Sequence, residues 1–343
     1  MIWADFGEPG LLEAFEQGKR APANEDQSAP LRQFSEALWT TVSARLPRHE
    51  CQFVKHCAQW HKDTLQAARS DDLAKAQRLS REIWKVARSR ALSPLACMLM
   101  DVFLPPADAY LAYRLGDYEG ARALLLKISA LDETLVGEHG LPLLSVHRLQ
   151  LCHNLMRVHT RLSENGAAVR LGAMLLDYIE FRIDPVAPEL VSRREVLDCA
   201  SIPVLSFYFD KICGEIAVAL AQEPADSAAG LFRLIRAHGS CGGSEFAPFA
   251  HKWIGLKEKA LCGELAGFRA AVIPLLRGGR STEPLLWYAA IIEVITVART
   301  FDEVPAQAFA ERLARAATDL PDAPWIMAAI LDQPVARQAV SAN

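Results

Sequence analysis

The 343-residue sequence predicts an all-α protein built as an irregular stack of antiparallel helical pairs. Three observations support this fold class. Apolar residues recur at spacings of three and four in many segments, which is the period of one face of a helix. The connections between these segments are short and rich in Gly, Ser, Asp or Pro. Alternation of the kind typical of a β-strand never extends beyond a few residues.

Length and composition limit the classes of protein to be considered. The chain is too long for one compact core of ordinary size, so two domains or one elongated array of repeats are expected. Apolar residues make up 51% of the sequence and charged residues 23%, which is ordinary for a globular protein and unlike a disordered one. A net charge of −4 and a pI near 6.2 argue against nucleic-acid binding driven by general electrostatics.

No segment resembles an export signal or a membrane span. The N-terminal residues lack the apolar core of a signal peptide. The most apolar run, 285–298, is interrupted by Glu293 and falls short of the roughly 20 residues that span a bilayer. We therefore expect a buried central helix at 285–298. The abundance of Ala and Arg over Lys favours a GC-rich bacterial source.

The eight cysteines stand singly along the chain, without a C-x-x-C pair. This spacing argues against a zinc ribbon and against a thioredoxin-like redox motif. Most of them have apolar neighbours, as Cys97 does in LACMLM, where a thiol acts as a small hydrophobic group. Together with the missing export signal, they indicate reduced thiols and a cytoplasmic location.

The predicted helices follow from periodicity and from the residues that end them. A short helix at 11–17 precedes a loop, and a longer helix at 31–46 is ended by Pro47. The apolar segment 94–104 is either a short helix or a buried crossing segment. Further helices are expected at 50–68, 73–90, 142–162, 167–183, 204–222, 224–238, 246–261, 265–276, 283–299 and 305–318.

The clearest helical hairpin is predicted at 109–132, where a short helix, a Gly-Asp turn and a longer amphipathic helix follow one another. Asp117 is expected to cap the second helix of this hairpin, because an Asp side chain can accept the unpaired N–H groups of a first turn. The segment Ser70-Asp71-Asp72 is expected to supply an N-cap and acidic charge at the start of the helix at 73–90. Ala121 is small enough to let the two helices of the hairpin approach closely.

This hairpin resembles the repeat unit of the tetratricopeptide (TPR) family. The second-helix signature of that family is matched by Gly116-Asp117-Tyr118, Ala121 and Leu131-Asp132. A partial second match is formed by Trp60, Asp72-Leu73 and Ala76. Two positions depart from the pattern, because Ala112 replaces the usual aromatic residue and Glu133 the terminal Pro. Ala76 and Ala121 are also 45 residues apart, whereas the family repeats every 34 residues. The sequence thus predicts an irregular, TPR-like α-solenoid or superhelix.

The domain boundaries are drawn from these elements. Pro185 and Pro188 interrupt helix formation, because Pro lacks an N–H and its predecessor avoids the helical region. The prediction comprises a partly ordered N-terminal extension at 1–30, a TPR-like helical half at 31–183, a Pro-containing connection at 184–203, a C-terminal helical half at 204–334 and a tail at 335–343.

A polar stripe marks the candidate binding site. It runs along the helix at 142–162, at spacings of three and four, and consists of His147, Gln150, Asn154, Arg157 and Arg161. In the TPR family the first helices of the pairs line a concave groove that holds peptides. The resemblance therefore implies that the same groove is also faced by Tyr110, Tyr113 and Arg114. Arg pairs with carboxylates and Tyr offers rigid contact area, so this composition suits an acidic or C-terminal peptide. The alternative is a solvated helix face with ordinary hydrogen bonds between helices.

Signals for catalysis or metal binding are poor. Cys241 lies in a G-x-C-x-G loop, which forms a nucleophile elbow only after a strand, whereas a helical segment precedes it and Gly239 fits a helix C-cap. The loop at 277–282 lacks the Gly spacing and the Lys of a phosphate-binding loop. The histidines show no metal-ligand spacing. We therefore expect no catalytic residue, no metal and no cofactor.

The function expected from these features is that of a non-catalytic adaptor or scaffold. It would bind a protein or peptide, acidic in character, in a concave helical groove, and neither nucleic acid nor a membrane. The alternative is a small-molecule-binding or catalytic helical protein of bacterial specialised metabolism, with a pocket inside the bundle. A third alternative is a peptide-sensing regulator, although the chain lacks a recognisable helix-turn-helix for acting on DNA alone.

Overall fold

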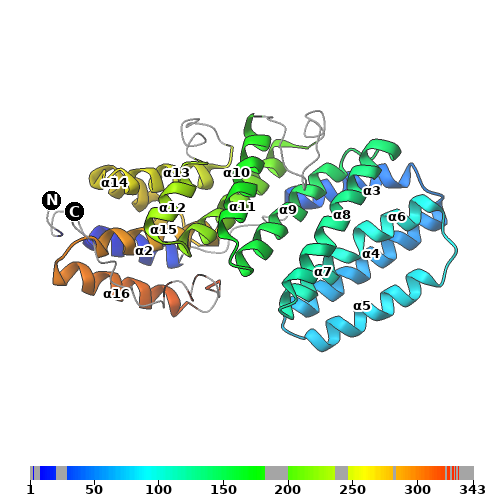
Figure 1. The fold of residues 1–343 in the computed structure, drawn as a ribbon, viewed down its shortest axis with the longest axis horizontal. Helices are drawn as coiled ribbons and strands as arrows, with labels where there is room; N and C mark the ends of the chain where they lie inside the picture. Colours follow the sequence, from blue (N-terminus) through cyan, green and yellow to red (C-terminus); the bar gives the residue numbers. More distant parts are fainter. Residues whose placement is uncertain are drawn as a thin grey trace. The chain divides into compact units, whose positions relative to one another are not determined.

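The computed structural model describes residues 3, 8–20, 29–181, 200–235, 246–280 and 283–320, together with 323, 324, 327, 329 and 331. Within these residues all regular secondary structure is α-helical, and neighbouring helices pack in pairs (Figure 1). The predicted all-α fold class is therefore confirmed. Contacts divide the chain into two compact units, unit 1 (Met1–Gln27 with Cys213–Asn343) and unit 2 (Ser28–Ile212).

Unit 2 contains the hairpin on which the prediction was built. Its helices are α3 (Ala29–Ser43), α4 (Arg48–Arg69), α5 (Leu73–Arg88), α6 (Pro94–Phe103), α7 (Pro105–Arg114), α8 (Tyr118–His139), α9 (Leu144–Arg161), α10 (Asn165–Phe181) and the first part of α11 (Ile202–Ala221). Three successive hairpins are formed by α4–α5, α7–α8 and α9–α10, and α8 also packs against α9 (Figure 1).

The three hairpins of unit 2 share one turn geometry. The residue before the acidic residue of each turn has a positive φ, and these residues are Asp71 (65°), Gly116 (83°) and Ser163 (60°). The N–H of the following acidic residue then donates to a carbonyl five residues earlier at 2.9 Å, in Asp72, Asp117 and Glu164 alike. A left-handed residue followed by such a bond is a standard way of ending a helix.

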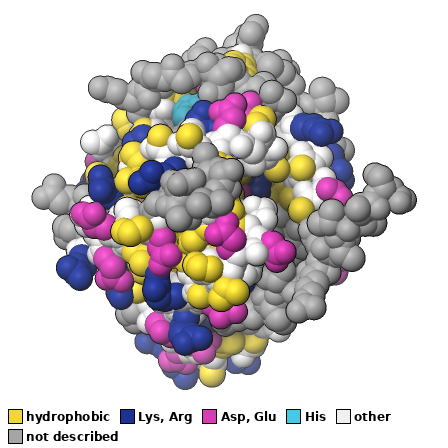
Figure 2. Space-filling model, turned by 90° about the vertical axis from the view of Figure 1, so that its left-hand side faces the viewer, with side chains coloured by type: hydrophobic (Ala, Val, Ile, Leu, Met, Phe, Trp, Pro, Cys, Tyr) yellow, Lys and Arg dark blue, Asp and Glu magenta, His cyan; other side chains and the backbone are white. Residues whose placement is uncertain are grey.

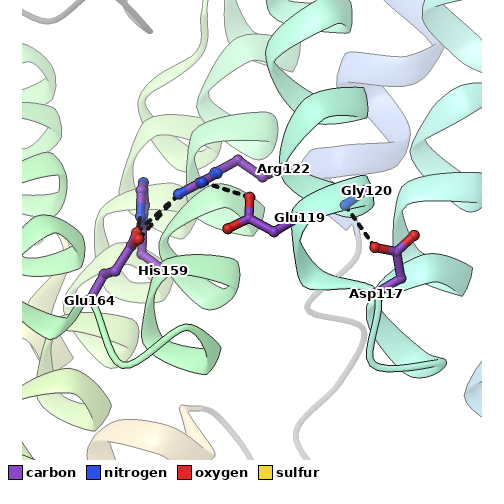
Figure 3. Close-up of polar contacts among 6 residues, drawn as sticks. All are labelled: Asp117, Glu119, Gly120, Arg122, His159 and Glu164. Carbon is purple, nitrogen blue, oxygen red and sulfur yellow. Dashed lines mark hydrogen bonds and ion pairs between the residues drawn. The ribbon is translucent and has the colours of Figure 1, made fainter.

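Asp72 and Asp117 cap the second helices of their hairpins, as predicted. Asp72 accepts a hydrogen bond from the N–H of Lys75 at 3.1 Å, and Asp117 accepts one from the N–H of Gly120 at 2.9 Å (Figure 3). Each carboxylate pairs an N–H group of the first turn that has no partner within the helix.

An alanine follows each acidic turn residue of unit 2 by four positions. Ala76, Ala121 and Ala168 are fully buried, and Ala76 packs with Ala67 and Leu111 of the adjoining helices. A methyl group at this position allows close approach of the helices. The hairpin is thus a recurring structural unit, and unit 2 has the packing of a helical repeat.

The apolar segment between the first two hairpins forms the short helix α6. The carboxylate of Glu50 on α4 accepts hydrogen bonds from the Ser93 N–H at 2.7 Å and from its hydroxyl at 2.5 Å. These bonds hold the pKa of Glu50 below its ordinary value. The Ser93 hydroxyl in turn accepts from the Ala96 N–H at 3.3 Å, so Ser93 joins α4 to the first turn of α6. The spacing of 45 residues between Ala76 and Ala121 therefore includes an additional helix, α6.

One described segment, Pro94–Arg114, is long and apolar enough to cross a bilayer by length and composition alone. In the structure this segment is divided into α6 and α7, and half of its most apolar window is buried. Both helices pack within unit 2, as helices of a protein core do.

Unit 1 consists of α2 (Glu8–Arg20), the remainder of α11, α12 (Ala225–Phe232), α13 (Pro248–Leu261), α14 (Leu265–Arg277), α15 (Pro284–Arg299) and α16 (Val304–Thr318). The helix α15 is buried along most of its length, which confirms the buried helix expected at 285–298. Its Glu293 is also largely buried and pairs with Lys257 of α13 at 2.7 Å. This pairing explains how a carboxylate is accommodated within an apolar run.

The N-terminal helix of unit 1 is longer than the one predicted at 11–17, and it packs against α14. Gly18 makes this approach possible, because a Cβ at that position would lie 1.9 Å from the Leu276 carbonyl oxygen. Phe15 of the same helix stacks on Trp287 at a centroid distance of 5.5 Å. The first residues of the chain thus contribute to the core formed by the C-terminal helices.

Several predicted features lie wholly or largely outside the described residues. They are the connection at 184–203, described only from 200 onward, the loop that contains Cys241, and the tail at 335–343. Figure 2 shows the face on the side of α2, α14 and α16, where acidic and basic side chains are interspersed with apolar ones. Among the coloured side chains of that face, neither sign of charge forms a continuous patch.

Candidate binding site

Two of the predicted groove residues on α7 and two on α9 meet in an aromatic–guanidinium cluster. We use this name for Tyr110, Tyr113, Tyr118, Arg157 and Arg161. The Arg161 Nε–H donates a hydrogen bond to the Tyr113 hydroxyl at 3.0 Å. The guanidinium groups of Arg157 and Arg161 each lie 5.4 Å from the centroid of the Tyr113 ring. Both distances are within the range of cation–π attraction.

The other two tyrosines extend the cluster along α7 and into α8. Tyr110 stacks on Tyr113 at 6.3 Å, and Tyr118 meets Tyr113 edge to face at 5.6 Å. Arg161 also lies 5.8 Å from the Tyr118 ring. Tyr113 is therefore the centre of the cluster.

The space between α7 and α9 at this cluster is almost filled. Tyr110 and Tyr113 face Asn154 and Arg157 across a recess of about 20 Å³, and Leu125 of α8 forms part of its wall. A volume of this size holds about one water molecule. A peptide side chain therefore has no slot to enter here, and any partner must contact the outer, partly exposed edge of the cluster.

Arg114 extends from α7 toward the turn of the first hairpin. One guanidinium nitrogen donates to the Ala68 carbonyl at 2.7 Å, and another pairs with Asp71 at 2.7 Å. A longer contact of 3.4 Å reaches the Tyr110 hydroxyl. Arg114 thus links the cluster to the α4–α5 turn, and its two short bonds give it a role in joining the first two hairpins.

His147 lies in the first turn of α9 and pairs with a buried carboxylate. Its Nδ1 is 2.8 Å from Asp132 Oδ2, and Asp132 is fully buried. Burial raises the pKa of Asp132, although the neighbouring His147 opposes this shift. His147 therefore serves the α8–α9 contact, and the structure does not bring it to the cluster.

Gln150 and Asn154 lie between these two ends of the stripe. Gln150 is exposed, and its Oε1 accepts a long hydrogen bond of 3.5 Å from the Tyr208 hydroxyl of α11. Asn154 lines the small recess beside Arg157. The stripe is therefore continuous on α9, but only Asn154, Arg157 and Arg161 accompany the tyrosines.

A second polar group fixes the end of α9 that carries Arg161. Figure 3 shows Arg122 of α8 between Glu119 and Glu164, at 2.6 Å and 3.2 Å respectively. His159 Nδ1 lies 2.6 Å from Oε2 of Glu164, an oxygen that Arg122 also contacts. The hydrogen bond with His159, followed by the charges of His159 and Arg122, lowers the pKa of Glu164.

Sequence reasoning had not assigned roles to Arg122 and His159. His159 and Glu164 are five residues apart along α9 and its turn, and Arg122 comes from another helix, so no spacing rule joins them. The contacts of Arg122 and His159 with Glu164 position the α9–α10 turn, because they hold it against α8 next to Arg161. Glu164 is partly exposed, so the energy of these contacts is modest.

The cysteines divide into buried and exposed groups in the described part of the chain. Cys51, Cys57, Cys152 and Cys213 are buried, as expected of small hydrophobic groups. Cys97 was placed with them by its apolar neighbours, but it is exposed, as is Cys262. The reason is that Cys97 lies on the outer side of α6, beside a hollow in unit 2 that is larger than the recess at the cluster.

Comparison with known proteins adds no assignment to this geometry. The chain matches no family model, no curated protein and no solved structure. The TPR resemblance of the hairpin therefore extends, in the structure, to paired helical packing.

Proposed function

We propose that this chain is a non-catalytic adaptor of the cytoplasm that binds an acidic segment of another protein. The proposed contact is the outer edge of the aromatic–guanidinium cluster on α7 and α9. The observation that carries the proposal is the placement of Arg157 and Arg161 against one tyrosine ring, Tyr113. The TPR-like resemblance of the hairpin supports a peptide as the ligand, by analogy of fold.

The cluster suits a carboxylate for a physical reason. A guanidinium stacked on an aromatic ring is held in one orientation, so it loses less side-chain entropy when it binds. A guanidinium also carries its N–H groups in the plane of a fork, and this geometry matches the two oxygens of a carboxylate. Arg157, Arg161 and the tyrosines are all partly exposed, so this edge is within reach of a partner.

The small recess defines the mode of binding. Because it holds about one water molecule, recognition depends on charge and on the flat tyrosine surface. We therefore expect an affinity that falls as salt is added, since contacts between exposed charges are screened.

The test is affinity purification from the source organism followed by mass spectrometry, with three versions of the chain. Arg157→Glu reverses one charge of the cluster, and Arg170→Glu makes the same change at an exposed position of α10 in the same unit. The proposal expects a partner that is retained by the unaltered chain and by Arg170→Glu but lost from Arg157→Glu. Thermal unfolding of each version checks that the fold is intact.

Two results would contradict the proposal. One is a set of protein partners that Arg157→Glu leaves unchanged. The other is the absence of any protein partner together with a metabolite that copurifies with the chain, as detected by native mass spectrometry. The second result would favour a small-molecule-binding protein in place of an adaptor.

A further inference from the structure

Unit 2 contains a pocket of about 550 Å³ on the side of α7 opposite to the cluster. It is formed by α5, α6, α7 and α8 together with the connection that leads into α6. Pockets for small molecules usually enclose 300–1,000 Å³. The volume here is therefore sufficient for an organic ligand, in contrast to the recess at the cluster.

The described residues that line the pocket include one aromatic side chain. Trp84 of α5 is fixed there because its indole N–H donates to Asp108 Oδ2 at 2.7 Å. The other oxygen of Asp108 accepts from the Ser80 hydroxyl at 2.5 Å. The wall is completed by further apolar groups, among them Leu92, Met100, Pro105 and Leu124. A fixed indole surrounded by such groups suits an aromatic ring.

Three cations stand around this wall. They are Arg88, Arg90 and Lys127, and all three are exposed. Arg88 lies 5.3 Å from the Trp84 ring and Arg90 lies 4.5 Å from the Phe53 ring. Among the described residues, neither arginine is within ion-pair distance of a carboxylate. Their N–H donors are therefore available to an anion.

The two acidic residues of the pocket offset only part of this positive charge. Asp108 already accepts hydrogen bonds from Trp84 and Ser80, which occupy both of its oxygens. Asp101 is the other acid of the wall. The pocket lining carries three cations and two carboxylates, so its net charge is positive. The three cationic side chains are exposed.

The pocket depends on the inserted helix α6. Met100 and Cys97 of α6 contribute to its wall, and the bonds between Ser93 and Glu50 hold the helix in place. A regular array would place α7 directly after the first hairpin. The insertion thus gives unit 2 a cavity that a simple succession of hairpins would lack.

We propose that this pocket binds a small aromatic carboxylic acid, with its ring against Trp84 and its carboxylate at Arg88, where Arg90 and Lys127 add to the positive charge. The site is separate from the aromatic–guanidinium cluster, so it does not depend on the proposed adaptor function. Binding requires no covalent chemistry and no cofactor.

Cys97 provides a direct reporter of occupancy. Its thiol is exposed in the pocket wall, while the exposed Cys262 of unit 1 is remote in sequence and serves as an internal control. The rate of alkylation at each cysteine is measured by mass spectrometry with increasing indole-3-acetate. Alkylation of Cys97 is expected to slow by roughly tenfold when the ligand reaches ten times its Kd, because the free fraction falls as 1/(1 + [L]/Kd). The rate at Cys262 is expected to stay constant.

Two controls isolate the charge. Tryptamine carries the same indole ring with an ammonium group, and it is expected to protect Cys97 far less. Arg88→Glu is expected to weaken indole-3-acetate binding by at least about tenfold, because a bond to a charged group contributes 1.5 kcal/mol or more. Arg78→Glu makes the same change at an exposed position of α5 that does not line the pocket, and it is expected to bind normally.

The proposal is overturned by any of three results. They are the absence of Cys97 protection up to millimolar indole-3-acetate, equal protection by tryptamine, and equal binding by the Arg88→Glu and Arg78→Glu variants. A loss of protein partners in Arg157→Glu has no bearing on these outcomes, so the two proposals fail independently.

Discussion

The two sides of α7 differ in how tightly they pack. Toward α9, Tyr110 and Tyr113 meet the facing helix and leave a recess of about 20 Å³. Toward α5, Pro105 and Asp108 border a pocket of about 550 Å³. We call these the closed side and the open side. In this unit the space is closed where one hairpin directly follows another, and it is open where α6 is inserted.

The two proposals assign different ligands to the two sides of α7. The closed side presents a rigid outer edge of arginine and tyrosine, which suits a carboxylate on the surface of a partner. The open side has a volume of about 550 Å³, which is within the range of small-molecule sites.

Adjacent leucines on α8 offer a matched pair for the two sides. Leu125 is buried and lines the closed recess, whereas Leu124 is partly exposed and lines the open pocket. Leu125→Ala is expected to lower the free energy of unfolding by about 2–5 kcal/mol, because the surroundings cannot collapse into the cavity. Leu124→Ala removes the same atoms beside existing space and is expected to cost about 1 kcal/mol.

Denaturant unfolding of the two leucine variants measures this difference. Leu126→Ala, at an exposed position of the same helix, is the control for helix propensity. Equal losses for Leu124→Ala and Leu125→Ala would show that the two sides of the helix are packed alike.

The interior between α4 and α9 is expected to weaken in mild acid. His61 of α4 is buried, and desolvation lowers its pKa from 6.5 to about 4, although a hydrogen bond with the Leu104 backbone opposes the shift. The unfolded chain therefore binds more protons than the folded one between these two pH values. The free energy of unfolding is unaffected by His61 above pH 6.5. Below that pH, protonation of His61 in the unfolded chain lowers the free energy of unfolding by about 1.4 kcal/mol for each pH unit, down to about pH 4.

Unfolding free energies measured from pH 7 to pH 4 test this expectation, with His61→Gln and the exposed His56→Gln as the matched pair. His61→Gln is expected to flatten the pH dependence, and His56→Gln to leave it unchanged. Asp132 acts in the opposite direction, since its raised pKa adds stability as the pH falls. An unaltered slope in His61→Gln would locate the acid sensitivity elsewhere.

The smallest of these effects concerns one hydroxyl group at the centre of the cluster. Tyr113→Phe keeps the ring that attracts both guanidiniums but removes the acceptor for the Arg161 Nε–H. The free energy of unfolding is expected to fall by about 1 kcal/mol, because the guanidinium loses a hydrogen bond to a neutral hydroxyl at a partly exposed site. Chemical denaturation gives the value, and a double-mutant cycle with Arg161→Lys separates the hydroxyl from the ring. Additive losses in that cycle would mean that the two groups do not interact.

The local features of the fold were readable from the sequence. Asp72 and Asp117 cap the helices they were expected to cap, because a cap depends on residues only a few positions apart. Ala76 and Ala121 could be predicted at helix contacts because they lie only four residues after the acidic residue of their turns. The third hairpin of unit 2 was predicted as a pair of helices, but its Ser163-Glu164 turn gave no sign that it shares the geometry of the other two.

The binding surfaces were less predictable, because they depend on contacts between distant parts of the chain. The polar stripe lies along α9 as one helix face. His147, however, pairs with Asp132, and Arg114 of α7 pairs with the α4–α5 turn. Periodicity places a side chain on a face of a helix, but it does not show which neighbour will bind it. A pocket inside the bundle was only an alternative at the sequence level, and none of its lining residues was identified, since its volume depends on where α6 holds α5 and α8.

In unit 2, α6 borders an open pocket, whereas Cys57 and Cys152 are buried between closely packed helices. Site-resolved thiol labelling of the native protein measures this difference in access. Cys97 is expected to react at least about a hundredfold faster than Cys57 and Cys152, which are buried and must wait for local unfolding. Burial also raises the pKa of Cys57, which lowers its reactive thiolate fraction. A Cys97 that reacted as slowly as Cys57 would mean that the pocket is closed and would contradict the account.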